Sequence, residues 1–438
     1  MFKKNRLPTI IVTGASGFIG RYFLEYIKED YNVIAIARRS STEAGVPFHP
    51  HINWVQWDIS NKRHFYEVLG YIMGKGGADY MVHLAAYYDY EYDDNPEYER
   101  TNITGTKNVM ELAKKVNVKH YLFESSMTVC KFPLRGEVIT ETSPANADFA
   151  YGLSKKAGEE MGMVYSQYFK CSMIRFAAVY SDWCEFAPLY KFMSTWLAKK
   201  WDSRFLGGKG ESAISYIHIH DLSRLMISII KNHERLPAYG IYLASPDGST
   251  SHKELLYTAT RDFYGKAIKS ILLPRPLTFP GLLFKHTLGK LGLIPEPYER
   301  FWMLRYIDHK LEVDASYTRE VLEWETTPRY HILRRLLFLL EKLKSHHNLW
   351  HLRNEAVLKI VTHRANLTIY EQMIREEDAI LDKITSFIRS PENVSLFPSY
   401  TALTNIDFQS MMSTLYHLLM AAVRSGDRSL MIKYIDDI

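Results

Sequence analysis

A tyrosine and a lysine four residues apart, Tyr151 and Lys155, form the pattern in this sequence that best suits acid/base chemistry. Residues at this spacing share one face of a helix. An ammonium beside a phenol favours the phenolate, which lowers the pKa of the phenol from about 10 toward the working range of a general acid or base. Because the same spacing arises by chance on many surface helices, the pair needs a second signal.

Ser126 is that second signal. It ends the stretch Glu124-Ser125-Ser126, which stands where a strand beginning at His120 is expected to end. Ligands of parallel α/β sheets bind beyond the carboxyl ends of the strands, and a serine there can donate a hydrogen bond to a reacting carbonyl or alkoxide oxygen. A serine at the end of a strand can also cap a turn, and both interpretations stay open here.

Three glycines near the N-terminus predict where a cofactor binds. Gly14, Gly17 and Gly20 follow the apolar run 9–12 and precede a helix-like segment, 21–27. Gly14 allows a sharp turn, Gly17 removes a Cβ that would hold a pyrophosphate away, and Gly20 lets the helix pack closely on the sheet. The helix N-terminus then faces the anion, although a tight turn without a ligand is the alternative. The other predicted contacts of this turn are Ser16, Phe18 and Ile19.

These residues need a scaffold in which strands and helices alternate. The sequence predicts one, because short apolar runs recur with helical patterns between them. The runs are 9–12, 32–37, 54–57, 80–84, 120–123, 171–176 and 240–244. We therefore predict an α/β fold with a Rossmann-type, doubly wound parallel sheet. The less regular, proline-containing segment 182–329 is expected to hold most of a small substrate lobe.

A chain of 438 residues is too long for one ordinary core, and we predict two domains, 1–343 and 344–438. Beyond this boundary the strand signal disappears and apolar residues recur at helical spacing. These residues are Tyr370, Met373, Ile374, Ile380, Leu381, Ile384, Phe387, Ile388, Phe408, Met411, Met412, Leu415, Leu418 and Leu419. They predict a C-terminal all-α bundle. Its apolar faces must pack on each other, on the main domain or on a second chain, which leaves a homodimer or a protein partner open.

Composition excludes several classes of protein. The net charge of +5 comes without a dense Lys/Arg block, so nothing favours nucleic acid as a partner. Cys130, Cys171 and Cys184 fit no metal-ligand spacing, and we expect reduced thiols in a cytoplasmic protein without a metal site. No apolar run approaches the roughly 20 residues that span a bilayer. Residues 1–8 lack the features of a signal peptide.

Taken in order, these and other motifs resemble the extended short-chain dehydrogenase/reductase family. That family includes nucleotide-sugar epimerases and dehydratases and the 3β-hydroxysteroid dehydrogenases. The motifs are Thr13–Gly20, Trp57-Asp58-Ile59, His83-Leu84-Ala85-Ala86, Asn95-Pro96, Asn102–Thr106, Ser125–Val129, Tyr151–Lys155, Arg175-Phe176 and Tyr216-Ile217-His218.

The resemblance implies a role for each matching position. Ser126 is implied to polarise the reacting oxygen and Tyr151 to transfer the proton. Lys155 is implied to bind the nicotinamide ribose as well, and Asn102 to support the catalytic residues from the following helix. Further positions implied to contact the cofactor are Asp58, Ile59, Ala85 and Ala86. Asp58 also suits a helix cap.

Arg38 and Arg39 indicate which nicotinamide cofactor is bound. NAD-binding relatives end the second strand with an acidic residue on the ribose 2′-hydroxyl. Here the run 32–37 is followed by two guanidiniums and the hydroxyl of Ser40, groups that suit a 2′-phosphate. We therefore predict NADP, with NAD less favoured. A solvated basic turn is the alternative.

The substrate side departs from the sugar-nucleotide pattern. Relatives of that kind commonly carry Arg-Asp directly before Tyr-Ile-His, whereas this chain has Ile214-Ser215. Aromatic residues are instead expected to face the pocket, although such clusters also form ordinary cores. The predicted substrate contacts are Tyr87, Tyr88, Tyr90, Trp183, Phe186 and Tyr190.

The hypothesis that follows is an NADP-dependent oxidoreductase that interconverts a ketone and a secondary alcohol on a small lipophilic molecule, hydroxysteroid-like or ketoacyl-like. A nucleotide-sugar epimerase or dehydratase that uses the same hydride chemistry transiently is the first alternative. The second is an NADP-sensing regulatory protein whose C-terminal helices are the output. Such a sensor has no need of Ser126, Tyr151 and Lys155.

Overall fold

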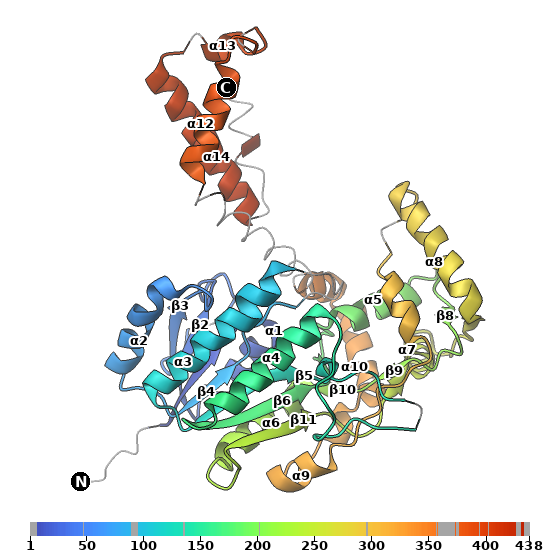
Figure 1. Ribbon diagram of the computed structural model, residues 1–438. Coiled ribbons are helices and arrows are strands. Elements are labelled where there is room, and N and C mark those ends of the chain that lie inside the picture. Colours follow the sequence, from blue (N-terminus) through green and yellow to red (C-terminus); the bar gives the residue numbers. More distant parts are fainter. Residues whose placement is uncertain are drawn as a thin grey trace. The chain divides into compact units, whose positions relative to one another are not determined.

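Among the described residues, a parallel sheet of seven strands has the order β11-β6-β5-β4-β1-β2-β3 (Figure 1). This order is that of a doubly wound Rossmann-type sheet, so the predicted fold class is confirmed. This computed structural model describes residues 7–46, 48–88, 95–134, 136–200, 202–294, 297–355, 357, 373, 376–393, 395–401, 403–425 and 431–432.

Helices follow the strands in the alternating order that the sequence predicts. The strands of the sheet are β1 (Thr9–Thr13), β2 (Asn32–Ala37), β3 (Ile52–Gln56), β4 (Tyr80–His83), β5 (His120–Ser126), β6 (Lys170–Phe176) and β11 (Tyr239–Ala244). The helices packed on it are α1 (Phe18–Ile27), α2 (Phe65–Gly74), α3 (Thr106–Val116), α4 (Ala150–Tyr165), α6 (Ile219–Lys231) and α9 (Ser316–Leu322). Each predicted apolar run overlaps one of these strands.

The central strands are mostly buried because helices cover both faces of the sheet. Ile10 and Val12 of β1 point to one face, into a core shared with α1 and α6. Ile11 points to the other face, into a core shared with α2 and α3. On the same face as α3, helix α4 packs against β5 and β6. The two cores hold the carboxyl ends of β1, β4 and β5 side by side, where a ligand of such a sheet binds.

Residues 182–329 hold the shorter elements of the fold. These are α5 (Ala187–Trp196), β8 (Phe205–Gly207), β9 (Ala213–Ile214), β10 (Tyr216–His218), β12 (Thr250–Ser251), α7 (His252–Tyr264), β13 (Ile271–Leu273), α8 (Arg275–Lys290) and η4 (Phe301–Tyr306). Not every element of this segment belongs to the predicted substrate lobe. Strand β11 is part of the seven-stranded sheet, and α6 and α9 are among the helices that pack on it. Strand β8 pairs with β13, β9 pairs with β12, and β10 pairs with β7 (Ala178–Tyr180).

The structure divides into two compact units, 1–354 and 355–438. The division falls beyond the predicted boundary at 343/344 because the chain after α10 (Ile332–Ser345) still packs on the first unit. Trp350 is only 1% exposed, and its ring lies 5.2 Å from that of Tyr190. The Asn354 side chain accepts a hydrogen bond from the Glu185 backbone N–H at 2.7 Å. These contacts make residues 345–354 part of the first unit.

The second unit is helical in its described residues. It contains α12 (Glu377–Ile388), α13 (Pro398–Thr401) and α14 (Asn405–Ser425). Ile388, Phe408 and Met412 form its core, so the two apolar stripes predicted from the sequence pack against each other. None of the described helices is long and apolar enough to cross a membrane.

Ending the chain after Asn354 should leave the first unit folded, whereas ending it after Lys344 should destabilise that unit. The shorter chain lacks Trp350, and loss of a buried tryptophan side chain costs about 3–5 kcal/mol. Thermal unfolding followed by circular dichroism compares the two chains. Equal midpoints would contradict the assignment of residues 345–354 to the first unit.

Candidate functional site

The glycine turn after β1 leaves no room for side chains. Gly14 has φ +72°, and a Cβ there would lie 2.6 Å from the backbone of Leu84 and Ala85. A Cβ on Gly20 would lie 2.3 Å from the Gly14 carbonyl oxygen. Gly17 begins α1, which has neither a side-chain cap nor an acidic residue in its first turn. Because the helix N-terminus is open and the backbone is accessible, this turn fits the pyrophosphate of a dinucleotide.

Cationic side chains gather beside this turn. The Arg39 guanidinium donates to the carbonyl oxygen of Ser16 at 2.6 Å. Burial, and then the charges of Arg21 and Arg38, lower the pKa of Arg39 below its usual value. The Ser40 hydroxyl donates to Glu43 at 3.0 Å, so an acid also borders the cluster. The end of β2 is therefore basic at the position where a ribose 2′-phosphate would lie.

Asp58 lies in a turn directly after β3. Its carboxylate accepts hydrogen bonds from the Ser60 backbone and hydroxyl at 3.0 and 2.8 Å, and it pairs with Arg100 at 2.8 Å. Burial raises the pKa of Asp58, but Arg100 and Arg38 outweigh it and hold the pKa below its usual range. Ile59 is buried and leaves no room for a Cβ on Gly105. Both interpretations of Asp58, turn former and cofactor neighbour, are compatible with this position.

Ala85 and Ala86 follow β4 next to a buried histidine. The ring of His83 hydrogen bonds to the hydroxyls of Thr13, at 2.6 Å, and Thr106, at 3.0 Å. Burial lowers the pKa of His83 to about 3, so the imidazole is neutral and ties β1, β4 and α3 together. The Ala85 backbone N–H also donates to the Thr13 hydroxyl at 3.3 Å. These bonds fix the chain that lies beside the glycine turn.

The predicted acid/base residues lie on neighbouring elements. Ser126 is the last residue of β5, and its hydroxyl also accepts a hydrogen bond from the Thr128 backbone at 3.2 Å, so it caps the turn as well. Tyr151 and Lys155 lie on one face of α4 and are 6% and 2% exposed. The Lys155 ammonium donates to the Glu124 carbonyl oxygen at 2.8 Å and lies 5.7 Å from the centre of the Tyr151 ring.

Asn102 connects the loop after β4 to α4. Its side-chain oxygen accepts from the Tyr87 backbone N–H at 2.6 Å, and its amide donates to the Tyr87 carbonyl oxygen and the Ser154 hydroxyl, both at 2.9 Å. The Ser154 hydroxyl in turn donates to the Tyr151 carbonyl oxygen at 2.7 Å. Asn102 therefore fixes the loop and the first turn of α4 relative to each other, in keeping with the supporting role that the family resemblance implies.

The structure divides the predicted substrate contacts into two groups. The Tyr88 ring lies 5.0 Å from the Tyr151 ring, and buried Tyr87 packs with Tyr151 in the same cluster. Trp183, in contrast, lies under residues near the end of the first unit, with the Lys342 ammonium 4.4 Å and the Arg353 guanidinium 4.9 Å from its ring. Tyr190 and Phe186 pack with Trp350 and Tyr216, respectively. Tyr90 lies outside the described residues.

A model of the NAD dependent epimerase/dehydratase family matches residues 10–244, more than half of the chain. The chain belongs to this family. It is thus an NAD(P)-dependent enzyme of the extended short-chain dehydrogenase/reductase type, as its motifs predict. The match spans the glycine turn, Asn102, Ser126, Tyr151 and Lys155.

Individual relatives have different activities in their names. The chain is 24% identical over 221 residues to a putative UDP-glucose 4-epimerase of Methanocaldococcus jannaschii, covering 49% of this chain and 71% of that protein. It is 25% identical over 147 residues to a putative dihydroflavonol 4-reductase of Synechocystis sp., covering 33% of this chain and 40% of that protein. Of the first four curated relatives, the chain spans 71, 42, 40 and 64% of the length.

A solved structure extends the likeness of this family member in three dimensions. The dTDP-glucose 4,6-dehydratase of Bacillus anthracis, in complex with NAD, has a TM-score of 0.59 at 18% identity. The alignment covers 79% of this chain and 99% of that chain. At this identity the likeness shows the common fold.

The sequence analysis missed a carboxylate in the site of this epimerase/dehydratase-family protein. Glu124 lies two residues before Ser126, so both side chains point to the same side of β5. One Glu124 carboxylate oxygen lies 3.8 Å from the Lys155 ammonium. The alternation of side chains along a strand is the signal that identifies Glu124 as a neighbour of the site.

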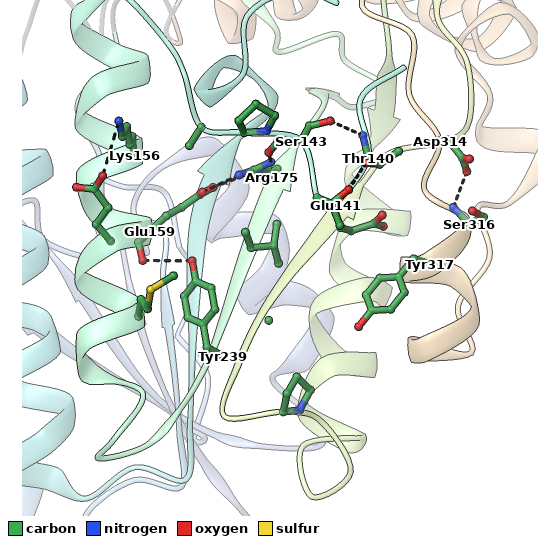
Figure 2. Close-up of a pocket in the computed structure, with 18 residues that line it drawn as sticks. Thr140, Glu141, Ser143, Lys156, Glu159, Arg175, Tyr239, Asp314, Ser316 and Tyr317 are labelled. Carbon is green, nitrogen blue, oxygen red and sulfur yellow. Dashed lines mark hydrogen bonds and ion pairs between the residues drawn. The ribbon is translucent and has the colours of Figure 1, made fainter. Parts of the chain in front are cut away.

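A buried ion pair behind α4 was also missed. Glu159, two turns after Tyr151, accepts two hydrogen bonds from Arg175, each at 2.9 Å (Figure 2). It also accepts one from the Ser125 hydroxyl at 2.6 Å. Arg175 also donates to the Ser143 carbonyl oxygen at 2.7 Å. The network connects α4 to the residue that precedes Ser126 and so holds together the two elements that carry the predicted acid/base residues.

Figure 2 shows this ion pair at the edge of a hollow of about 740 Å³. The rest of the lining consists of residues 140–145 with Lys156, Glu160, Met163, Pro237, Tyr239, Gly240, Ile241, Asp314, Ser316 and Tyr317. Its lining includes none of the residues predicted to bind cofactor or substrate. We therefore place the functional site at the carboxyl ends of the strands, where the glycine turn and the acid/base residues lie.

Glu159→Gln should lower the free energy of unfolding by about 3–5 kcal/mol, because it leaves the buried Arg175 guanidinium without a compensating charge. Urea denaturation measures this loss. Glu160→Gln is the matched control, since Glu160 is exposed and forms only a long pair with Lys156, at 3.8 Å. Its effect should stay below about 0.5 kcal/mol. Similar losses in the two variants would contradict a special role for the buried pair.

Proposed function

We propose that this protein is an NADP-dependent oxidoreductase that interconverts a ketone and a secondary alcohol on a small lipophilic molecule of hydroxysteroid or ketoacyl type. One arrangement carries the proposal. Ser126 ends β5, Tyr151 and Lys155 share a face of α4, and the open N-terminus of α1 lies at the same edge of the sheet. An oxygen-polarising hydroxyl, a general acid/base and a dinucleotide site are the parts that such a reaction needs.

Each of these residues has a distinct part in the proposed reaction. When bound, the nicotinamide supplies or accepts the hydride. In the reducing direction the Tyr151 phenol gives its proton to the developing alkoxide, while the Ser126 hydroxyl donates a hydrogen bond to the same oxygen. The Lys155 ammonium favours the tyrosinate that remains. In the oxidising direction Tyr151 takes the proton back.

Two features support a lipophilic substrate over a sugar nucleotide. The surroundings of Tyr151 are aromatic, with Tyr87, Tyr88 and Tyr98 in contact with it or with one another. The positions where sugar-nucleotide relatives commonly carry Arg-Asp are unsuited to holding a phosphate. Ile214 packs against the core, and Ser215 is buried with its hydroxyl 2.6 Å from that of Ser245.

A nucleotide-sugar epimerase or dehydratase is the second candidate. The names of relatives favour it, since a putative UDP-glucose 4-epimerase and a dTDP-glucose 4,6-dehydratase are among them. Such an enzyme returns the hydride to its substrate or product, so the nicotinamide undergoes no net change. A net change in NADPH therefore separates the two candidates.

We further propose a cytoplasmic location and a role in assembly or partner binding for the second unit. The three cysteines are buried and free, as expected in a reducing compartment.

An NADP sensor with a helical output remains the third candidate. Retention of Ser126, Tyr151 and Lys155 favours catalysis over it.

Tyr151→Phe should retain NADP binding and lose about 10²–10⁴-fold in turnover, because only the proton donor is removed. NADPH absorbance is followed with a panel of ketosteroids, β-ketoacyl thioesters and UDP-glucose. Tyr168→Phe, a change on the exposed surface beyond α4, is the matched control and should be fully active. Full activity of Tyr151→Phe would place the acid elsewhere. Turnover of UDP-glucose without net NADPH oxidation would favour the second candidate.

Arg38→Ala should weaken NADP binding by roughly 1.5–3 kcal/mol, the loss of one charge-assisted bond, and leave NAD nearly unchanged. Arg39→Ala should weaken both cofactors, because Arg39 also holds the Ser16 carbonyl oxygen. Isothermal titration of both cofactors measures these effects, with exposed Arg63→Ala as the control for charge. A wild-type preference for NAD would contradict the assignment.

A further inference from the structure

Helix α8 turns an apolar face outward. Leu277 and Phe284 of α8 and Leu291, the residue that caps its C-terminus, are spaced seven residues apart, two helical turns, and are therefore in line along the helix. They are 53, 59 and 66% exposed. Phe279 and Leu283 widen this surface, at 55 and 50% exposed. In Figure 1 α8 stands at the margin of the first unit. We call these five residues the α8 apolar face.

The polar side of α8 faces the protein instead. The Lys285 ammonium pairs with Asp202 at 3.0 Å and with Glu299 at 3.1 Å, and its side chain is 19% exposed. Thr278 and Leu282 are the residues of α8 that are buried against the lobe. A helix of a globular domain normally has the opposite arrangement, with charges outward and apolar residues inward. An exposed apolar surface of this kind marks an interaction site.

The segment that contains α8 carries charge of one sign. Residues 263–295 contain five Lys or Arg and no Asp or Glu. Two of these cations form ion pairs with acids from other segments. Lys285 pairs with Asp202 and Glu299, and the Arg275 guanidinium lies 3.7 Å from the Asp308 carboxylate. Lys266, Lys269 and Lys290 are exposed. The segment therefore presents apolar side chains together with positive charge.

We propose that the α8 apolar face attaches the protein to the surface of an anionic phospholipid bilayer. Phenylalanine and leucine side chains of an amphipathic helix enter the boundary between headgroups and acyl chains, while nearby lysines attract anionic headgroups. The attachment is monotopic, in agreement with the absence of a membrane-spanning helix among the described residues. It is independent of the hydride chemistry proposed above.

The charge favours a bilayer over a second copy of the chain. Two copies joined through this face would bring like charges together, which opposes association. An anionic lipid surface instead attracts each nearby Lys or Arg. The same lysines also predict that binding weakens as salt screens the attraction.

Flotation of the full chain with lipid vesicles tests the proposal. Wild-type protein should float with vesicles of phosphatidylcholine that contain about 30% phosphatidylglycerol, and much less with phosphatidylcholine alone. High salt should reduce the bound fraction. In the double variant Phe284→Glu, Leu291→Glu, the affinity for these vesicles should fall by roughly tenfold or more. The double variant Tyr66→Glu, Met73→Glu adds the same two charges at residues of α2 that are 72 and 51% exposed, and it should bind like wild type.

Three results would overturn the proposal. If the wild-type protein floats with neither kind of vesicle, the proposal is overturned before any variant is tested. Equal binding by the double variant, with an unchanged melting temperature, would exclude the α8 apolar face. A dimer in light scattering that the double variant breaks, without vesicle binding by the wild type, would assign this face to a second copy. NADP titration of every variant reports on the cofactor site separately and so distinguishes this result from failure of the proposed function.

Discussion

Backbone contact at the carboxyl end of β1 is the constraint on which the whole site depends. Gly14 touches the chain after β4, and Gly20 touches Gly14, at distances that no Cβ permits. Helix α1 therefore begins directly at the end of β1, with its N-terminus uncapped. The strand order reverses between β1 and β4, so this N-terminus opens toward the strands that carry the rest of the site.

Buried polar contacts then hold the reacting groups in position. His83 connects β1, β4 and α3 through two threonine hydroxyls, and Asn102 connects the next loop to α4. Glu159 and Arg175 connect α4 to the end of β5. Each of these groups has its partners inside the protein, and an unsatisfied one would be costly. A site built on such bonds is already organised before substrate arrives.

The α8 apolar face and the aromatic surroundings of Tyr151 both suit a lipophilic substrate. A lipophilic ketone or alcohol partitions into bilayers, and an enzyme attached to the bilayer surface would meet it there. The two ideas rest on separate observations, one on the outward face of α8 and one on the cluster of Tyr87, Tyr88 and Tyr151. The second unit is explained by neither: Ile388, Phe408 and Met412 of its apolar stripes pack together, whereas Phe387 stays 59% exposed.

The fold class, and the motifs for which we propose a catalytic role, are visible in the sequence alone. Apolar runs alternate with helical patterns because both faces of the sheet are covered, and the glycine spacing follows from backbone contact that only glycine permits. Patterns of this kind are local, so they are visible in one sequence. The family match over residues 10–244 agrees with them.

Only the tertiary structure decided which distant residues meet. Glu124 approaches Lys155, and Glu159 pairs with Arg175, because α4 lies across β5 and β6. Trp183 lies under residues of the α10 region, so its aromatic character alone did not reveal its neighbours. The division after Asn354 also depends on a long-range contact, the bond to Glu185. Periodicity in the sequence shows which side of a helix or strand is apolar. Which distant segment packs on that side depends on the tertiary fold.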